Sequence, residues 1–437
     1  MHRTFRGGIA TILLLALLSA CTAPTEHGDG PATPSGTPEP ATVTLTLANY
    51  GGLHVDTLLA EYQRSNPDIR IEITGDPVGA SSYRPSLEDD IGGSSLADVV
   101  LFSDGSLPTV FANADRFANL ADEASGADAL PWASDWGTDS TGRVLAVPVT
   151  IEPAALCFRG DLLTEAGIAG GRDHLEQLLG ADGGGWGTYF DVGRRYHEAT
   201  GRAWFDQPEI IWRAMVSQVS DAFAYPAAGG APVVDAELRV RWDLLAAAVT
   251  DGLSAHEEAW LWDGGRAFVD GSFATFLCPP WALDLVEANV TAGGGDASTG
   301  WDLADVLPGG GWSWAGAYAA RTVTSAHPDE ASDLVAWLID PDQQAGLYAA
   351  GVGVPSDRQA AANVAEDPAP HAFFNDAPLG AIIASRAEHV PSGVVRADEL
   401  QLAVDVFLPA LHALDTGAAD APSAWADAMA RLAEHEF

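Results

Sequence analysis

The sequence predicts an α/β protein, and three observations support this class. Residues 43–102 read as strand, helix, strand, helix, strand, which is typical of a mostly parallel sheet covered by helices. With 47% apolar and 19% charged residues, the chain can bury a substantial core. At 437 residues, it is long enough for two or three domains, or for two lobes built from interleaved segments.

The N-terminus has the features of an export signal. Arg3 and Arg6 precede an apolar run, 9–18, that is too short to cross a bilayer. The sequence Leu-Ser-Ala-Cys that ends at Cys21 resembles the lipobox of bacterial lipoproteins, whose cysteine is acylated after cleavage; an ordinary signal with a chance cysteine is the alternative. We therefore expect a signal peptide at 1–20 and a lipid-anchored, proline-rich flexible tether at 21–42.

The first folded segments follow from local patterns. Residues 43–48 alternate as a strand, 55–64 place apolar side chains at helical spacing, and 69–73 and 97–102 read as further strands. Ligands of parallel sheets bind beyond the carboxyl ends of the strands. Asn49 and Asp104 follow such ends, so they are candidate ligand-binding residues, with capping of the strand end as an equal alternative.

The rest of the chain is chiefly helical. Strands are expected at 144–149, 155–158 and 274–277. Helices are expected at 161–166, 174–179, 188–199, 209–219, 238–250, 328–338 and 341–350.

Composition excludes several functions. The chain has no lysine and a formal net charge of -40, which argues against binding nucleic acid or an anionic membrane surface. Zinc-protease, serine-hydrolase elbow and phosphate-loop motifs are absent, and the 11 histidines are scattered without metal-ligand spacing. We therefore expect neither a cofactor nor a metal.

The tryptophans point to a ligand. Several of the 14 lie next to turn residues, namely Trp186, Trp204, Trp281, Trp301, Trp312 and Trp314. Indole faces stack on the apolar faces of pyranose rings while carboxylates bond to hydroxyls, so this composition suits a sugar cleft. Core packing is the alternative for each tryptophan. Exported cysteines also form disulfides, so Cys157 and Cys278 are expected either to be bridged or to be two buried thiols.

The order of several segments resembles the extracellular solute-binding lipoproteins of ABC sugar importers, of the cellobiose and oligosaccharide-binding type. The similarity runs over about residues 43–435. Its segments are 96–100, 155–167, 274–281, 314–318, 336–338, 341–344, 353–356 and 373–378.

The resemblance implies a type II periplasmic-binding-protein fold, with two α/β lobes, a hinge and a central ligand cleft. The lobes are expected at 43–150 plus 266–325 (the N-terminal lobe) and 151–265 plus 326–437 (the mainly helical C-terminal lobe), with crossovers near residues 150, 265 and 325.

It further implies that Trp281 and Trp314 line the cleft and that Cys157 and Cys278 are bridged. Trp312 and Asp206 are further candidate ligand-binding residues. Glu152 is another, because it stands where relatives often carry an aspartate.

The expected function is that of a monomeric, non-enzymatic receptor anchored by lipid to the outer face of the cell membrane. It would capture a β-linked di- or oligosaccharide, similar to cellobiose, and deliver it to the membrane permease subunits of the importer. One alternative is a lipid-anchored glycosidase that uses paired carboxylates such as Asp104 and Glu152. Another is a receptor of the same fold for a peptide or a metal.

Overall fold

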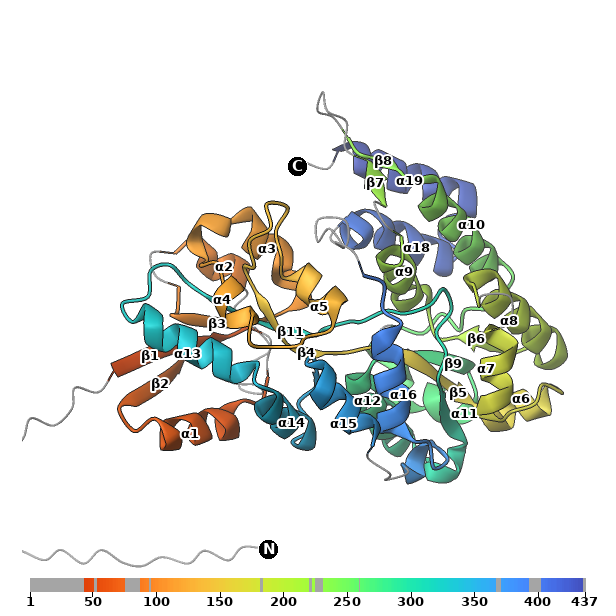
Figure 1. Ribbon diagram of the computed structural model, residues 1–437. Helices are drawn as coiled ribbons and strands as arrows, with labels where there is room; N and C mark the ends of the chain where they lie inside the picture. The colour runs from red at the N-terminus through yellow and green to blue at the C-terminus, as the bar shows by residue number, and fades with distance from the viewer. Residues whose placement is uncertain are drawn as a thin grey trace, which may run out of the picture. The chain divides into compact units, whose positions relative to one another are not determined.

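The computed structural model describes residues 43–50, 53–74, 87–93, 96–180, 184–219, 222–224, 231–258, 260–366, 371–392 and 402–434 (Figure 1). The expected signal peptide, Cys21 and the tether lie outside these residues. Within the part of the chain that is described, no helix is long and apolar enough to cross a membrane.

Among the described residues, the first sheet contains six strands. In spatial order they are β12 (Val354–Pro355), β4 (Val147–Ile151), β11 (Ala317–Arg321), β3 (Val99–Ser103), β1 (Val43–Asn49) and β2 (Ile69–Thr74). β2 and β3 pair with β1 in parallel, whereas β11 pairs antiparallel with both β3 and β4, and β12 antiparallel with β4. The sheet is therefore mixed, and the predicted parallel arrangement holds for its first three strands.

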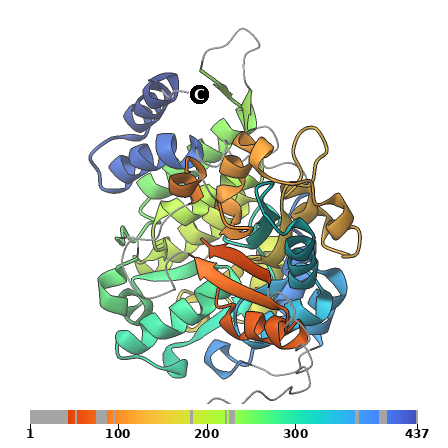
Figure 2. The ribbon, with the colours of Figure 1, turned by 90° about the vertical axis from the view of Figure 1, so that its left-hand side faces the viewer.

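Helix α1 (Asp56–Ser65) confirms the predicted spacing. Its buried residues are Leu58, Leu59 and Tyr62, the residues that the sequence places on one face. The helix ends at Asn66, whose backbone N–H bonds to the carbonyl of Tyr62, and proline follows. The helix lies beside β2 in both views of the ribbon (Figures 1 and 2).

In the part of the chain that is described, the second sheet contains four strands, in the order β10 (Trp301–Ala304), β5 (Ala155–Arg159), β9 (Phe273–Cys278) and β6 (Ala203–Phe205). β5 pairs antiparallel with β10 and β9, and β6 pairs parallel with β9. Every residue of β5 and β9 is buried, which explains why both read as continuous apolar runs. The expected disulfide joins these two strands, with the Cα atoms of Cys157 and Cys278 5.7 Å apart.

The pairing of strands corrects the predicted lobe boundaries. Residues 266–325 were expected in the first lobe, but β9 and β10 belong to the second sheet, and only β11 returns to the first. Conversely, helix α13 (Pro328–Leu338) packs on β11, and β12 completes the first sheet. The chain passes to the second sheet at Glu152–Ala154, near the expected residue 150, and returns between β10 and β11 rather than near 265.

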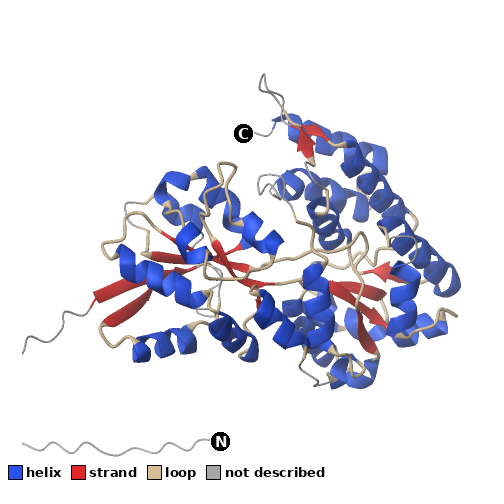
Figure 3. Cartoon of the chain, viewed as in Figure 1, coloured by secondary structure: helices blue, strands red, loops and turns tan. Residues whose placement is uncertain are grey.

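Helices predominate around and after the second sheet (Figure 3). The remaining helices are α2 (Leu87–Ile91), α3 (Leu107–Ala112), α4 (Ala121–Ala124), α5 (Pro131–Trp136), α6 (Gly160–Glu165), α7 (Arg172–Gly180), α8 (Trp186–Thr200), α9 (Pro208–Ser217), α10 (Ala236–Thr250), α11 (Ala267–Asp270), α12 (Pro280–Ala292), α14 (Pro341–Ala349), α15 (Arg358–Ala365), α16 (Leu379–Glu388), α18 (Leu408–Asp415) and α19 (Ala421–Glu434). One π-helical turn, Ala403–Phe407, precedes α18, and β7 (Phe223–Ala224) and β8 (Val233–Val234) form a short hairpin. The α/β class is thus confirmed.

Candidate functional site

Two of the predicted tryptophans meet at the ends of different elements. Trp281 lies in the first turn of α12, and Trp314 lies in the segment between β10 and β11. Their ring centroids are 5.2 Å apart, and the indole nitrogen of Trp281 donates to the carbonyl of Trp314 at 3.2 Å. Both side chains are only partly buried, so part of each indole surface is available to a ligand.

Trp312 supports this pair from within the core. Its ring stacks on that of Trp314 with centroids 5.4 Å apart and an interplanar angle of 18°, and it is 3% exposed. Trp312 therefore positions Trp314 rather than presenting a face of its own. Trp186, Trp204 and Trp301 are also buried, so core packing accounts for these three.

Trp260 is a third aromatic residue of the site, and the sequence reasoning missed it. It is 52% exposed, and its ring lies 5.9 Å from that of Trp281 and 6.2 Å from that of Trp314. The segment has no helix or strand pattern. However, Trp260 and Trp262 repeat the Trp-x-Trp spacing of Trp312 and Trp314, also beside glycines, and this signal could have found it.

The backbone around Trp260 is strained, and two hydrogen bonds of Trp262 hold it in place. Trp260, Trp262 and Asp263 all have positive φ, of 69°, 36° and 51°, a region that residues other than glycine rarely adopt. The N–H of Trp262 bonds to the carbonyl of Glu258, and its indole nitrogen donates to Asp206 at 3.0 Å. Such strain persists only where surrounding contacts fix it, and it is concentrated at functional segments.

Glu152 lies against both tryptophans. Its carboxylate accepts the backbone N–H of Trp281 at 3.3 Å, and its carbonyl accepts the N–H of Trp314 at 3.1 Å. The residue is 5% exposed. Burial raises the pKa of Glu152 to about 8; the Trp281 N–H opposes this rise, and the charge of Asp104 adds to it.

Asp104 approaches the same segment from the end of β3. Its backbone N–H donates to Gly316 at 2.8 Å, and its carboxylate accepts the N–H of Ala315 at 3.1 Å. Burial raises the pKa of Asp104 to about 7, against the lowering effect of backbone N–H groups at Gly105, Ala315 and Gly316. Asp104 and Glu152 therefore share one neighbourhood, as expected for residues at the ends of β3 and β4.

The other two predicted carboxylate and amide residues have structural contacts. Asp206 follows β6, is 3% exposed, and holds the indole of Trp262; burial raises its pKa to about 7. The side chain of Asn49 bonds to the backbone of Leu53 through its nitrogen at 2.6 Å and its oxygen at 3.2 Å. Asn49 thus caps the end of β1, which is the alternative that the sequence left open.

A positive charge also reaches the tryptophans. The guanidinium carbon of Arg213 lies 5.6 Å from the ring centroid of Trp314, within cation–π range. Glu209, one helical turn earlier in α9, accepts from Arg213 at 2.8 Å and orients it. No local pattern predicts this contact, because it joins two segments that are distant in the sequence.

The site includes space for a small molecule. Glu152 and Trp281 line a cavity of about 410 Å³, whose wall is completed by α14, α16 and residues 351–354. This volume lies within the range of small-molecule pockets. Among the residues that the structure describes, no group of three or more His, Cys, Asp or Glu side chains is arranged to hold a metal ion.

Comparisons with known proteins agree with this architecture. The family profile of bacterial extracellular solute-binding proteins matches residues 57–373. A crystal structure of a family 1 extracellular solute-binding protein is 30% identical, with a TM-score of 0.78 over 89% of this chain and 98% of that one. Among curated protein sequences, none matches this chain significantly.

Two more distant structures share the fold. The sugar-binding protein MalE of Xanthomonas citri is 19% identical, with a TM-score of 0.68 over 90% of this chain and 97% of that one. The galacto-N-biose/lacto-N-biose I-binding protein of a Bifidobacterium longum ABC transporter, solved with lacto-N-biose, is 16% identical, with a TM-score of 0.68 over 90% and 96%. At these identities, the likeness concerns the fold.

Proposed function

Because this chain belongs to the family of bacterial extracellular solute-binding proteins, we propose that it is the exported sugar receptor of an ABC importer. Its cargo is a β-linked di- or oligosaccharide similar to cellobiose. The receptor releases this cargo unchanged to the membrane permease subunits. It acts as a monomer held at the outer face of the membrane by lipid on Cys21.

The observation that carries this proposal is the group of partly exposed indoles, Trp260, Trp281 and Trp314, beside the buried carboxyl of Glu152 and the partly buried carboxyl of Asp104. Indole faces offer the broad apolar surface on which the C–H face of a pyranose packs. Trp281 and Trp314 approach each other at 75°, so they present faces in two directions. A sugar ring on one indole can thus be held against the edge of the other.

The carboxyls supply the polar half of the recognition. With pKa values of about 8 and about 7, Glu152 and Asp104 retain protons near neutral pH to a degree that ordinary carboxyls do not. A protonated carboxyl donates one hydrogen bond and accepts others, which matches the mixed donor and acceptor character of sugar hydroxyls. Trp312 and Asp206 position the aromatic residues from behind.

Receptor function also requires that the two lobes close on the ligand. A ligand shifts such an equilibrium only if it binds the two states with different affinity. Trp281 lies in α12, which follows β9 of the second sheet, and Asp104 follows β3 of the first sheet. A sugar that contacts both residues would therefore favour the closed state, which the permease receives.

The glycosidase alternative receives no support from the family match. It makes a different prediction, because incubation with oligosaccharides would then yield shorter products. A receptor returns the same oligosaccharide after release.

A thermal melting screen tests the proposal. The purified protein is melted alone and with each member of a panel of di- and trisaccharides that differ in linkage. A ligand that binds only the folded state raises the melting midpoint by mass action. At a hundredfold excess over Kd, it adds about 2.7 kcal/mol to the free energy of unfolding. A rise confined to one linkage class supports a sugar receptor and names its cargo; a folded protein that responds to no sugar would refute it.

A further inference from the structure

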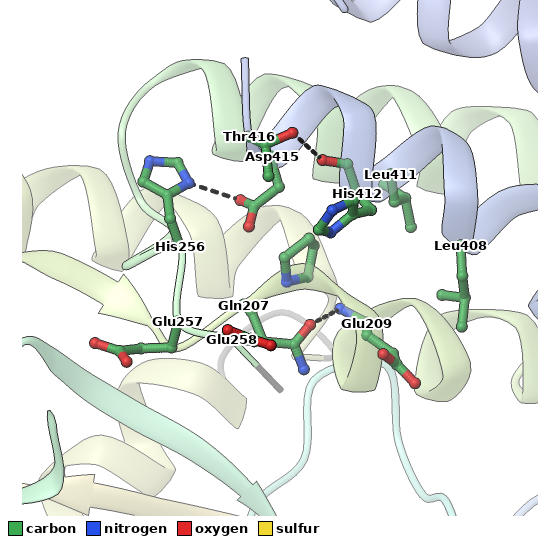
Figure 4. A pocket seen from close by; sticks show the side chains of 11 residues that line it. Gln207, Glu209, His256, Glu257, Glu258, Leu408, Leu411, His412, Asp415 and Thr416 are labelled. Carbon is green, nitrogen blue, oxygen red and sulfur yellow. Dashed lines mark hydrogen bonds and ion pairs between the residues drawn. The ribbon is translucent and has the colours of Figure 1, made fainter. Parts of the chain in front are cut away.

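A second cavity, of about 570 Å³, lies between the start of α9, residues 256–258 and helix α18 (Figure 4). Apolar side chains of Pro208, Leu408 and Leu411 form part of its wall. The polar wall has four carboxylate residues, Glu209, Glu257, Glu258 and Asp415, together with Gln207, His256, His412 and Thr416, and none of the described residues that line it is an arginine. The cavity is large enough for a sugar unit and is biased toward negative charge.

Two buried polar side chains in this wall have unused hydrogen-bonding capacity. Gln207 is 5% exposed; its oxygen accepts the N–H of Glu209 at 2.6 Å, while its amide nitrogen has no partner among the described residues. Asp415 is 9% exposed; one oxygen bonds to His256 at 2.9 Å, and the other has no partner in the part of the chain that is described. Both side chains line the cavity, so a ligand that fills it can complete their hydrogen bonds.

The two groups require different chemistry from that ligand. The amide nitrogen of Gln207 is a donor, so it needs an oxygen acceptor such as a hydroxyl. The free oxygen of Asp415 is an acceptor, so it needs an O–H or N–H donor. A simple metal ion or a bare amine satisfies only the second requirement, whereas a polyhydroxylated unit satisfies both.

The charge of the cavity wall further restricts the chemical class of the ligand. Arg213 compensates Glu209, but Glu257 and Glu258 form no ion pair within the described residues. Burial raises the pKa of Glu257, and the charges of Asp263 and Asp270, which lie outside the cavity wall, repel its carboxylate as well. A bound cation would relieve this repulsion.

We propose that this cavity binds an amino-sugar unit of the cargo, with a hydroxyl accepting from Gln207 and the ammonium group facing Glu257, Glu258 and Asp415. This inference rests on the proposed sugar-receptor function and names a substrate class for it. The cavity adjoins the aromatic site: Glu209 lines it and orients Arg213, which lies 5.6 Å from the ring of Trp314.

The test compares three β-1,4-linked trisaccharides by titration calorimetry: the glucosamine trimer, its N-acetylated form and cellotriose. The glucosamine trimer should bind about tenfold more tightly than cellotriose, since a charge-assisted hydrogen bond is worth about this factor. The N-acetylated trimer, which lacks the charge, should lose this preference.

Paired variants separate a local effect from the overall negative charge. Glu257→Gln with Glu258→Gln should abolish the preference for glucosamine. Glu61→Gln with Glu198→Gln changes the net charge equally at two exposed positions and should preserve it.

The outcomes separate this inference from the proposed function. If cellotriose binds and the glucosamine trimer is not preferred, the amino-sugar assignment is overturned but the receptor function stands. The same holds if both double variants lose the preference equally. A failure of every sugar to bind the folded protein overturns the receptor function as well.

Discussion

Replacing Glu152 by Gln tests whether burial holds a proton on this carboxyl. The pKa of Glu152 rises from 4.5 to about 8 in the folded protein. Its contribution to stability is therefore complete below pH 4.5 and is lost as the pH rises through about 8. Because one pH unit corresponds to about 1.4 kcal/mol, ionising Glu152 in the folded state costs up to about 5 kcal/mol more than in the unfolded chain.

The assay is urea unfolding at pH 5 and pH 9, followed by circular dichroism. Between these values, the free energy of unfolding of the native protein should fall relative to that of Glu152→Gln by several kcal/mol, with about 4 kcal/mol as the upper figure, because only the three pH units from 5 to about 8 contribute. Glu61→Gln, at an exposed position of α1, should follow the native protein at both values.

Sugar affinity gives a second readout of the same group. Since Gln keeps an N–H donor where the protonated carboxyl has an O–H, the variant should lose less affinity than the native protein between pH 5 and pH 9, a range over which Asp104 titrates in both. Equal changes in stability for the native protein and the variant between pH 5 and pH 9 would show that Glu152 ionises normally. The explanation from burial would then be wrong.

Three further outcomes are expected. Trp314→Ala should weaken sugar binding by about 1 to 3 kcal/mol in titration calorimetry. Trp337 packs on α1, so Trp337→Ala should leave the affinity unchanged. Unchanged affinity in Trp314→Ala would make Trp314 purely structural. Trp260→Ala should weaken binding by about 0.5 to 1.5 kcal/mol while barely moving the melting midpoint, because the residue is 52% exposed; a large drop in the midpoint would contradict this role. Replacing Cys157 and Cys278 together by Ser should lower the free energy of unfolding by about 5 kcal/mol in the chain-entropy account, since the bridge closes a loop of 121 residues; denaturant curves that coincide with those of the native protein would refute it.

Local patterns predicted the first half of the first sheet well. The alternation at 43–48 and the helical spacing of Leu58, Leu59 and Tyr62 are properties of a few neighbouring residues, and the structure reproduces them. Strand pairing is not local, so the boundaries of the lobes were wrong for 266–316 and for the segment from α13 to β12. The bridge between Cys157 and Cys278 was a non-local signal that could have placed β9 beside β5.

The resemblance to a known family predicted part of the site. Trp281 and Trp314 were proposed on that basis, and the structure brings them into contact. Trp260 and Arg213 were missed, because each approaches Trp314 from a segment that is distant in the sequence. Asn49 shows the opposite case, in which two hydrogen bonds to the backbone of Leu53 explain the side chain without any ligand.

The passages between the two sheets also have a practical consequence. Glu152 opens the short link from β4 to β5, and Trp314 lies in the return link before β11, so any rotation of one sheet against the other changes backbone torsions beside both. The indole of Trp314 would then shift relative to Arg213 and Trp260, whereas deeply buried indoles such as those of Trp204 and Trp301 keep their surroundings. Intrinsic fluorescence of the unlabelled protein should therefore report opening and closing in real time.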